Sequence, residues 1–211
     1  SGSGVGSKGG GGAKEGAARG ISDDSVASSG GAGEQGRIIY GNIHRFLHYL
    51  LSCNFSEILT VFIALMIGWP LPLVALQILW LNLITDVFPA FALALEPSAP
   101  GVMKRPPRDP KESLLSLRFV GLIVWQGLLL AGGALLSFGV GMNWHGTTGD
   151  GLRHATTIAF MTLALAQVFH VFNVRSQSRS AFTGRLFTNG WLWAAVATCL
   201  VLQAAAVYLP I

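Results

Sequence analysis

Two neighbouring apolar segments decide the fold: SCNFSEILTVFIALMIGWP, residues 52–70, and LWLNLITDVFPAFALAL, residues 79–95. Both have the composition of helices that cross a lipid bilayer, yet each contains one acidic residue, Glu57 in the first and Asp86 in the second. A charged carboxylate in the middle of a bilayer costs at least about 2.5 kcal/mol on insertion scales, and such residues usually mark a functional site. The two acids therefore indicate where the function of this chain lies.

The composition of the whole chain is that of a membrane protein. Of its 211 residues, 51% are hydrophobic and 11% are charged, whereas about a quarter of the residues of a soluble domain carry a charge. Five apolar segments are long enough to cross a hydrocarbon core of about 30 Å, which takes about 20 helical residues. The sequence thus predicts an all-α membrane protein, a bundle of five transmembrane helices in a lipid bilayer. The predicted spans are residues 43–67, 71–95, 119–142, 155–174 and 191–209.

The N-terminal segment has a different composition. Glycine, serine and alanine dominate residues 1–36, which carry too little apolar surface to offset the entropy cost of ordering. We expect a disordered Gly/Ser-rich tail or linker there, followed by a membrane domain over residues 37–211. The formal net charge is +4, but the basic residues are spread among the gaps between apolar segments. We therefore expect no nucleic-acid partner, which would need a basic patch or stripe.

The basic residues also predict the orientation of the chain in the membrane. Of the 14 lysines and arginines, only Arg153 lies in a connection expected on the outer side. Because Lys and Arg are enriched in cytoplasmic loops, we expect an integral membrane protein with a cytoplasmic N-terminus and an exoplasmic C-terminus. The residues assigned to the cytoplasmic side are Lys8, Lys14, Arg19, Arg37, Arg45, Lys104, Arg105, Arg108, Lys111, Arg118, Arg175, Arg179 and Arg185.

Polar residues accompany both acids at helical spacing. Asn54 precedes Glu57 by three residues, so the two lie on one face of a helix. Asn82, Thr85 and Asp86 follow the same rule in the next span, where they stand at positions i, i+3 and i+4. Each acid is therefore expected to have further oxygen-bearing side chains beside it.

The two polar groups are expected to meet. The short GWPLP connection, residues 68–72, makes the two spans antiparallel neighbours. Glu57 lies 12 residues before Trp69, and Asp86 lies 14 residues after Pro72. At about 1.5 Å of rise per residue, both acids lie at a similar depth.

Such a group of side chains has the chemistry of a hard-cation site. Ca²⁺ takes six to eight oxygen ligands, and two carboxylates match the charge of one divalent ion. Pro89 removes a backbone N–H shortly after Asp86 and favours local unwinding, which is tolerated at membrane depth where the chain lines a site. The alternative interpretation is that Glu57 is protonated and the polar residues only join helices through hydrogen bonds.

Three stretches of the sequence carry a resemblance to a known family. GRIIYGNIHRFLHYLLSCNFSEI, LWLNLITDVFPAFALALEP and VMKRPPRDPKESLLS resemble the C-terminal membrane half of the P-type cation-transporting ATPases, in their calcium-pump-like branch. The resemblance runs from Gly36 to the C-terminus and implies that the spans correspond to the fifth to ninth transmembrane helices of the family.

The resemblance also implies a role for the polar residues. It implies that Asn54, Glu57, Asn82, Thr85 and Asp86 hold the transported cation. Ca²⁺ is favoured over Mn²⁺ as that ion, because sodium–potassium pumps carry an acid where Asn82 stands.

In the fourth span, Gln167 and His170 stand where some relatives have another ligand carboxylate. The absence of that acid favours one cation per transport cycle. A packed, hydrogen-bonded histidine is the alternative interpretation of His170.

Other parts of the family pattern do not occur in this sequence. The phosphorylated aspartate lies in a D-K-T-G motif, which the chain does not contain. We therefore expect that the chain alone is not an active ATPase, and that ATP and Mg²⁺ act only through cytoplasmic domains that this sequence lacks. The expected partner is the remainder of a P-type ATPase, namely its first four helices and its cytoplasmic domains. The alternatives are a standalone non-catalytic membrane protein that acts through a partner, such as the other half of a split pump, and an unrelated passive channel.

Overall fold

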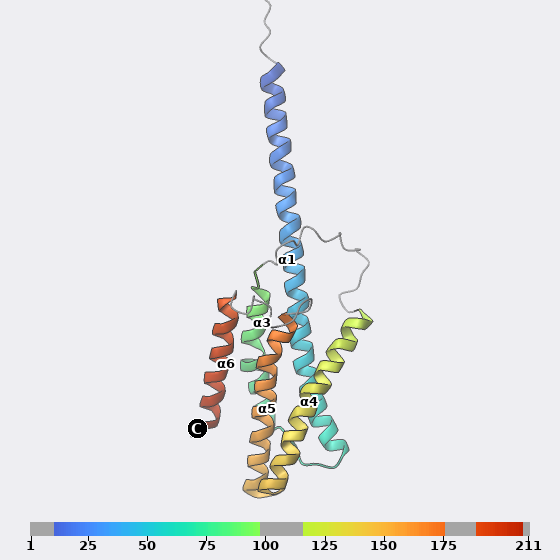
Figure 1. The fold of residues 1–211 in the computed structure, drawn as a ribbon, viewed down its shortest axis with the longest axis vertical. Coiled ribbons are helices and arrows are strands. Elements are labelled where there is room, and N and C mark those ends of the chain that lie inside the picture. Colours follow the sequence, from blue (N-terminus) through green and yellow to red (C-terminus); the bar gives the residue numbers. More distant parts are fainter. Residues whose placement is uncertain (1–10, 98–115, 176–188, 209–211) are drawn as a thin grey trace, which may run out of the picture. The chain divides into compact units, whose positions relative to one another are not determined.

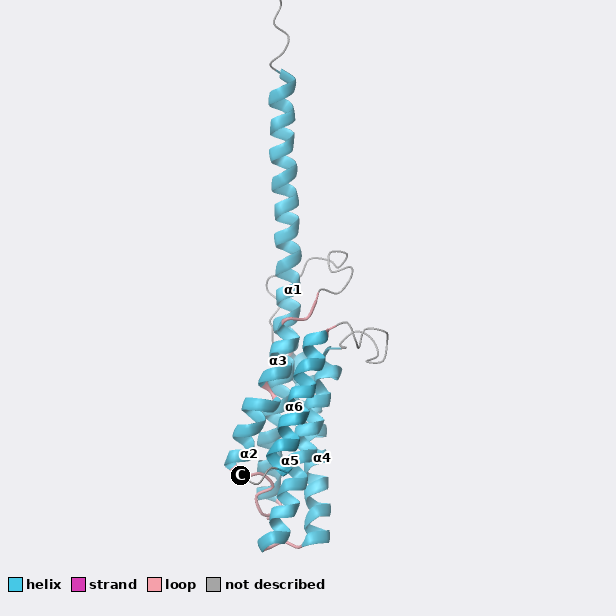
Figure 2. Ribbon diagram, turned by 90° about the vertical axis from the view of Figure 1, so that its left-hand side faces the viewer, coloured by secondary structure: helices cyan, strands magenta, loops and turns pink. Residues whose placement is uncertain are grey.

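The computed structural model describes residues 11–97, 116–175 and 189–208, and helices are the only regular elements in these ranges (Figure 2). In chain order the elements are α1 (Gly11–Met66), α2 (Ala75–Trp80), the π-helical turn η1 (Leu81–Thr85), α3 (Val87–Ala94), α4 (Leu117–His145), α5 (Gly149–Arg175) and α6 (Gly190–Tyr208). The described residues from Gly41 onward belong to one compact unit, which contains every contact discussed below.

Five helical segments are long and apolar enough to cross a membrane, which confirms the predicted number of spans. These segments are Gly31–Met66, Ala75–Ala94, Leu117–His145, Gly149–Arg175 and Gly190–Tyr208. Their outer faces are apolar: Leu76, Leu136 and Val201 are 75%, 74% and 68% exposed. Side chains of this kind would be unfavourable in water over so large a surface, so the bundle is an integral membrane protein.

The N-terminal segment is helical where the structure describes it, whereas the sequence predicted disorder over residues 1–36. Helix α1 begins at Gly11, and residues 1–10 lie outside the described residues. Residues 31–36 are all exposed, and three of them are glycines, so packing does not hold this part of the helix. Glycine costs about 1 kcal/mol relative to alanine in a helix interior. Disorder of this segment in solution therefore stays a prediction.

The turn after α1 is specified by one glycine. Gly68 has φ of +76°, a conformation that favours glycine. The Trp69 N–H donates to the Ala64 carbonyl at 2.8 Å, and the Gly68 N–H donates to the Leu65 carbonyl at 3.1 Å. These two bonds form the Schellman motif that ends many helices. The chain then reverses into α2, so that the first two spans are neighbours, as the sequence predicted.

Close packing of small residues joins α4 to α5, which lie side by side (Figure 1). A Cβ atom added at Gly141 would lie only 2.9 Å from the Ala155 Cα atom, so the two backbones approach each other at this point. Small residues allow membrane helices to approach in this way. A core cluster around Phe138, Met142 and Ala159 continues the same contact.

The second predicted span is interrupted at the position of its polar residues. The Asp86 N–H donates to the Leu81 carbonyl at 2.9 Å, which is the i→i−5 bond of a π-helical turn. The sequence predicted local unwinding caused by Pro89, and the structure has an irregular turn just before this proline. Helix α3 then continues to Ala94 and packs against α6.

Candidate cation site

The carboxylate of Glu57 lies between α1, η1 and α5. Its Oε2 atom accepts a hydrogen bond of 2.6 Å from the Asn82 amide, and its Oε1 atom accepts one of 3.0 Å from the Gln167 amide. Glu57 is 3% exposed and Gln167 is fully buried. Residues from three spans therefore meet at one carboxylate, and Asn82 reaches Glu57 as the antiparallel arrangement predicted.

Asp86 is buried without ordinary hydrogen bonds. It is 1% exposed, and both of its carboxylate oxygens lack a hydrogen-bond partner. The Cys53 thiol lies beside it, but a thiol is only a weak donor. The Oε1 atom of Gln167 is also buried without a partner. Buried polar atoms are normally satisfied, so three unpaired oxygens in one region need an explanation.

Thr85 contributes to this region through its backbone. A regular helix would pair the Thr85 carbonyl with the N–H of residue 89, but Pro89 has none. Instead, the Tyr49 hydroxyl lies 3.1 Å from the Thr85 carbonyl and 3.2 Å from the Gln167 carbonyl. Tyr49 is fully buried. Its single proton is shared between two backbone acceptors on different helices.

Sequence reasoning did not identify Tyr49 as part of this region. The available signal was weak: a tyrosine inside an apolar span has a hydroxyl that needs a partner, but the sequence does not say which one. The same holds for Cys199, whose thiol donates to the Ile84 carbonyl at 3.3 Å. Both residues donate to carbonyls within the π turn and so support its position.

The two remaining predicted residues have other partners. Asn54 is half-buried, and its amide donates to the Leu50 carbonyl of its own helix at 2.8 Å. The Nε2 atom of His170 lies 2.9 Å from the Ser52 hydroxyl, and its ring stacks on that of Tyr49. The structure thus brings Glu57, Asn82 and Gln167 into direct contact and gives Asn54 and His170 hydrogen bonds elsewhere. A role for either as a cation ligand stays a prediction.

The donor types of the region suit a hard cation. In the part of the chain that the structure describes, no three His, Cys, Asp or Glu side chains lie close enough together to hold a metal ion by themselves. The available groups are two carboxylates and side-chain amides. Oxygen ligands of this kind are those that Ca²⁺ prefers.

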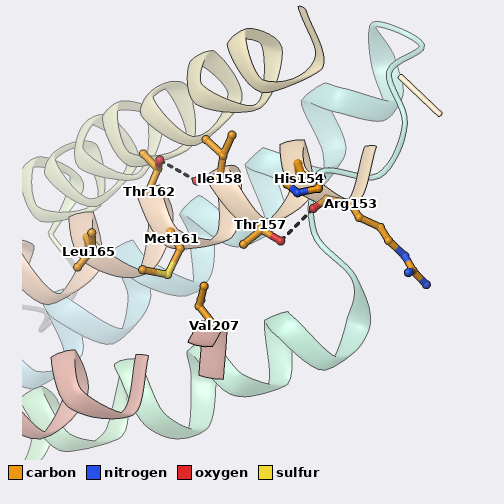
Figure 3. A pocket seen from close by; sticks show the side chains of 8 residues that line it. All are labelled: Arg153, His154, Thr157, Ile158, Met161, Thr162, Leu165 and Val207. Carbon is orange, nitrogen blue, oxygen red and sulfur yellow. Dashed lines mark hydrogen bonds between the residues drawn. The ribbon is translucent and has the colours of Figure 1, made fainter. Parts of the chain in front are cut away.

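A surface groove lies apart from these residues. It has a volume of about 530 Å³ and is lined by residues of α5 together with Val207 of α6 (Figure 3). The Thr157 and Thr162 hydroxyls on its wall donate to carbonyls of their own helix, and the side chain of Arg153 points away from it. Its lining contains no acidic residue, so the groove does not have the chemistry of a cation site.

Comparison with known proteins places the chain in a family. A family model described as the C-terminus of cation transporting ATPases matches residues 70–211. The chain is 39% identical over 202 residues to calcium-transporting ATPase 1 of Bacillus cereus, an alignment that covers 90% of this chain and 23% of the relative. It is 40% identical over 198 residues to a calcium-transporting ATPase of Bacillus subtilis, which covers 94% of this chain and 22% of the relative.

A further relative has a broader description. The chain is 34% identical over 198 residues to the probable cation-transporting ATPase F of Mycobacterium tuberculosis, which covers 94% of this chain and 21% of the relative. The chain therefore spans less than a quarter of the length of these relatives. Since the family match covers more than half of the chain and the five predicted apolar helices are present, the chain belongs to the P-type cation-transporting ATPases, as part of their C-terminal membrane domain.

Proposed function

We propose that this chain forms the cation-binding membrane half of a P-type pump, with Glu57 and Asp86 as the charged ligands of the transported ion. Asn82, Thr85 and Gln167 supply further oxygens, and Asn54 and His170 are the outer candidates. The observation that carries the proposal is the set of three buried oxygens without partners, two on Asp86 and one on Gln167. Bound as transported substrate, a cation would satisfy all three.

The proposed ligation requires the two amides to turn. Asn82 and Gln167 now present N–H groups to the Glu57 carboxylate, which can only accept hydrogen bonds when ionised. A cation between Glu57 and Asp86 takes the place of these donors, and each amide then offers its oxygen instead. Two carboxylates balance one divalent charge, and the calcium-transporting relatives favour Ca²⁺ over Mn²⁺.

The energy source of transport lies in other parts of the proposed pump. ATP and Mg²⁺ act on the cytoplasmic domains of such a pump, and the present chain contributes ligands and helices that respond to them. The N-terminus is placed on the cytoplasmic side, as the distribution of basic residues predicts. An immunoblot of source membranes with an antibody against residues 100–118 tests whether the chain is part of a larger pump. A band several times larger than 22.3 kDa is expected, and a band at that mass would favour a chain that acts through a separate partner.

Cation binding is tested by thermal unfolding of the chain in lipid nanodiscs at increasing Ca²⁺ concentration. A ligand that binds only the folded state stabilises it by RT ln(1 + [L]/Kd), about 2.7 kcal/mol at 100 times Kd. The variants Glu57→Gln and Asp86→Asn each remove one of two charges. Each should raise the Ca²⁺ concentration that gives half of the maximal stabilisation. Asp150→Asn, at an exposed acid in the first turn of α5, is the matched control. Equal stabilisation of the original chain and of the double variant E57Q/D86N by Ca²⁺ would show that the site is misassigned.

A further inference from the structure

A second group of polar residues, two buried and two largely buried, lies at the far end of α3 from the π turn. Four side chains from four parts of the chain meet there, and we call them the Glu96 clamp: Asn42 of α1, Glu96 two residues after α3, Arg175 at the end of α5, and Asn189 directly before α6. None of the four is among the predicted cation ligands. Their contacts are more numerous than the capping of one helix end requires.

Glu96 is the centre of the clamp. Its Oε1 atom accepts a hydrogen bond of 2.7 Å from the Arg175 Nε atom, and its Oε2 atom accepts one of 2.5 Å from the Asn189 amide. The side chains of Glu96 and Arg175 are each only 10% exposed. Ion pairs on the surface contribute little, but breaking a buried and hydrogen-bonded pair leaves an uncompensated charge and is strongly destabilising.

The two asparagines hold the end of α3 through its backbone. The last carbonyls of a helix have no partner within the helix. The Asn42 amide donates to the Ala94 and Glu96 carbonyls at 3.0 and 2.9 Å, and the Asn189 amide donates to the Ala92 carbonyl at 3.2 Å. The side-chain oxygen of Asn189 also accepts from the Leu192 N–H, at 3.1 Å, and so caps α6. The end of α3 is therefore attached to α1, α5 and α6 at once.

The clamp lies at a similar distance from the candidate site along two segments of the chain. Asp86 precedes Glu96 by ten residues, and Gln167 precedes Arg175 by eight. At about 1.5 Å per helical residue these intervals are about 15 and 12 Å. The ion pair between Glu96 and Arg175 thus joins the two segments that carry Asp86 and Gln167. Fixing the ends of both segments fixes how these two side chains face each other.

We infer that Glu96 is a positioning residue, which acts through α3, α5 and α6 to hold the π turn and Asp86 in register with Gln167. What the positioned residues do rests on the proposed function, whereas the positioning itself is a property of the helices. It can be measured without any cation, because α6 contains a reporter. The Cys199 thiol contacts the Ile84 carbonyl in the π turn, ten residues after the Asn189 cap, and Cys199 is 1% exposed.

The test is the rate at which N-ethylmaleimide labels Cys199 in nanodiscs without added divalent cation, resolved from Cys53 by mass spectrometry of the two peptides. A buried thiol reacts only when the structure opens locally. Glu96→Gln removes one charge-assisted hydrogen bond and the ion pair. We expect Cys199 to be labelled at least about tenfold faster, since hydrogen bonds to charged groups are among the stronger ones. Labelling at the original rate would overturn the inference.

Three controls separate positioning from a general loss of stability. Asp150→Asn is the same chemical change in an exposed pair and should leave the labelling rate unchanged. Gly141→Ala crowds the α4–α5 contact, away from the clamp. If it accelerates Cys199 labelling as much as Glu96→Gln does at an equal loss of thermal stability, the inference is wrong. Should E96Q fail to fold, the double variant E96Q/R175Q leaves neither charge buried alone, and its Cys199 should still be labelled faster than in the original chain.

The Ca²⁺ titration then distinguishes the two proposals. If the original chain shows no response to Ca²⁺, the proposed function fails, while the labelling rates still decide whether Glu96 positions the π turn. If the original chain responds, E96Q should need several times more Ca²⁺ for the same stabilisation. An unchanged Ca²⁺ midpoint in E96Q would overturn the link between the clamp and the site, even with faster labelling.

Discussion

The close approach of α4 and α5 at Gly141 gives a quantitative prediction for Gly141→Ala. The added Cβ atom would lie 2.9 Å from the Cα atom and 3.1 Å from the Cβ atom of Ala155, whereas carbon atoms in contact prefer about 3.5–4.0 Å. Because one of these atoms belongs to the backbone, rotation of a side chain cannot relieve the overlap. The two helices must separate, and overpacking of this kind costs about 1–3 kcal/mol.

Gly132→Ala is the matched control, since it lies in the same helix and its added Cβ atom would meet nothing within 4 Å. In both variants the higher helix propensity of alanine adds about 1 kcal/mol to the free energy of unfolding. The difference in stability between the two variants therefore isolates the cost of overpacking. At about 2–4 °C per kcal/mol for a chain of this size, Gly141→Ala should unfold about 2–12 °C below Gly132→Ala. In Gly127→Ala the added atom overlaps only a side-chain atom of Phe55, so its unfolding temperature should lie between those of Gly141→Ala and Gly132→Ala.

Thermal unfolding followed by tryptophan fluorescence in nanodiscs measures the three midpoints. Equal midpoints for Gly141→Ala and Gly132→Ala would refute the reasoning, because they would mean that the α4–α5 contact has room for a methyl group. A low midpoint for both Gly141→Ala and Gly132→Ala would also contradict the reasoning, since the Cβ atom added at Gly132 contacts no other atom.

Three further substitutions test the contacts around the π turn. Tyr49→Phe removes the proton donor of the Thr85 carbonyl and should lower the free energy of unfolding by about 1–3 kcal/mol, the cost of a buried unpaired acceptor, measured by thermal unfolding. Pro89→Ala restores an N–H for the same carbonyl and should slow amide hydrogen exchange over residues 81–88. The same variant should be stabilised less by Ca²⁺ in a titration. Faster exchange over these residues would contradict this account. Trp80→Phe leaves the buried Gln203 Oε1 atom without its 2.9 Å partner and should lower the free energy of unfolding by about 1–3 kcal/mol. In a double-mutant cycle, Trp80→Phe should cost much less in a Gln203→Met background.

The sequence predicted the fold class and the spans because bilayer thickness and hydropathy determine both. Five apolar segments correspond to five helices, and most bounds differ by a few residues, but the first helical segment begins at Gly31, 12 residues before the predicted start at residue 43. The sequence predicted that the polar groups of the first two spans would meet, but not the hydrogen-bond partner of each side chain, because that depends on the rotation of each helix. Asn54 and Glu57 share a face by spacing, yet Glu57 lies against Gln167 whereas Asn54 bonds to its own helix. Gln167 was a weaker candidate in the sequence, and it makes one of the two direct contacts with Glu57.

The Glu96 clamp shows a second limit of sequence reasoning. Glu96 lies in a segment that reads as the end of a span, next to a connection rich in proline and basic residues, where an exposed acid would be expected. Its partners Arg175 and Asn189 follow 79 and 93 residues later. Nothing in the local pattern distinguishes a buried acid from an exposed one there, since the distinction depends on where α5 ends and α6 begins.

The irregular second span links these observations. Pro89 removes the donor that Thr85 would otherwise use, and the π turn diverts the Asp86 N–H from the Asn82 carbonyl to the Leu81 carbonyl. The two departures from a regular helix, at the Asp86 N–H and at Pro89, are therefore only three residues apart. Pro89 leaves the Thr85 carbonyl for another element, and the Tyr49 hydroxyl, 36 residues earlier in the chain, donates to it. A helix weakened at this point needs external supports, which explains why contacts from α1, α5 and α6 gather at the π turn and again at the end of α3.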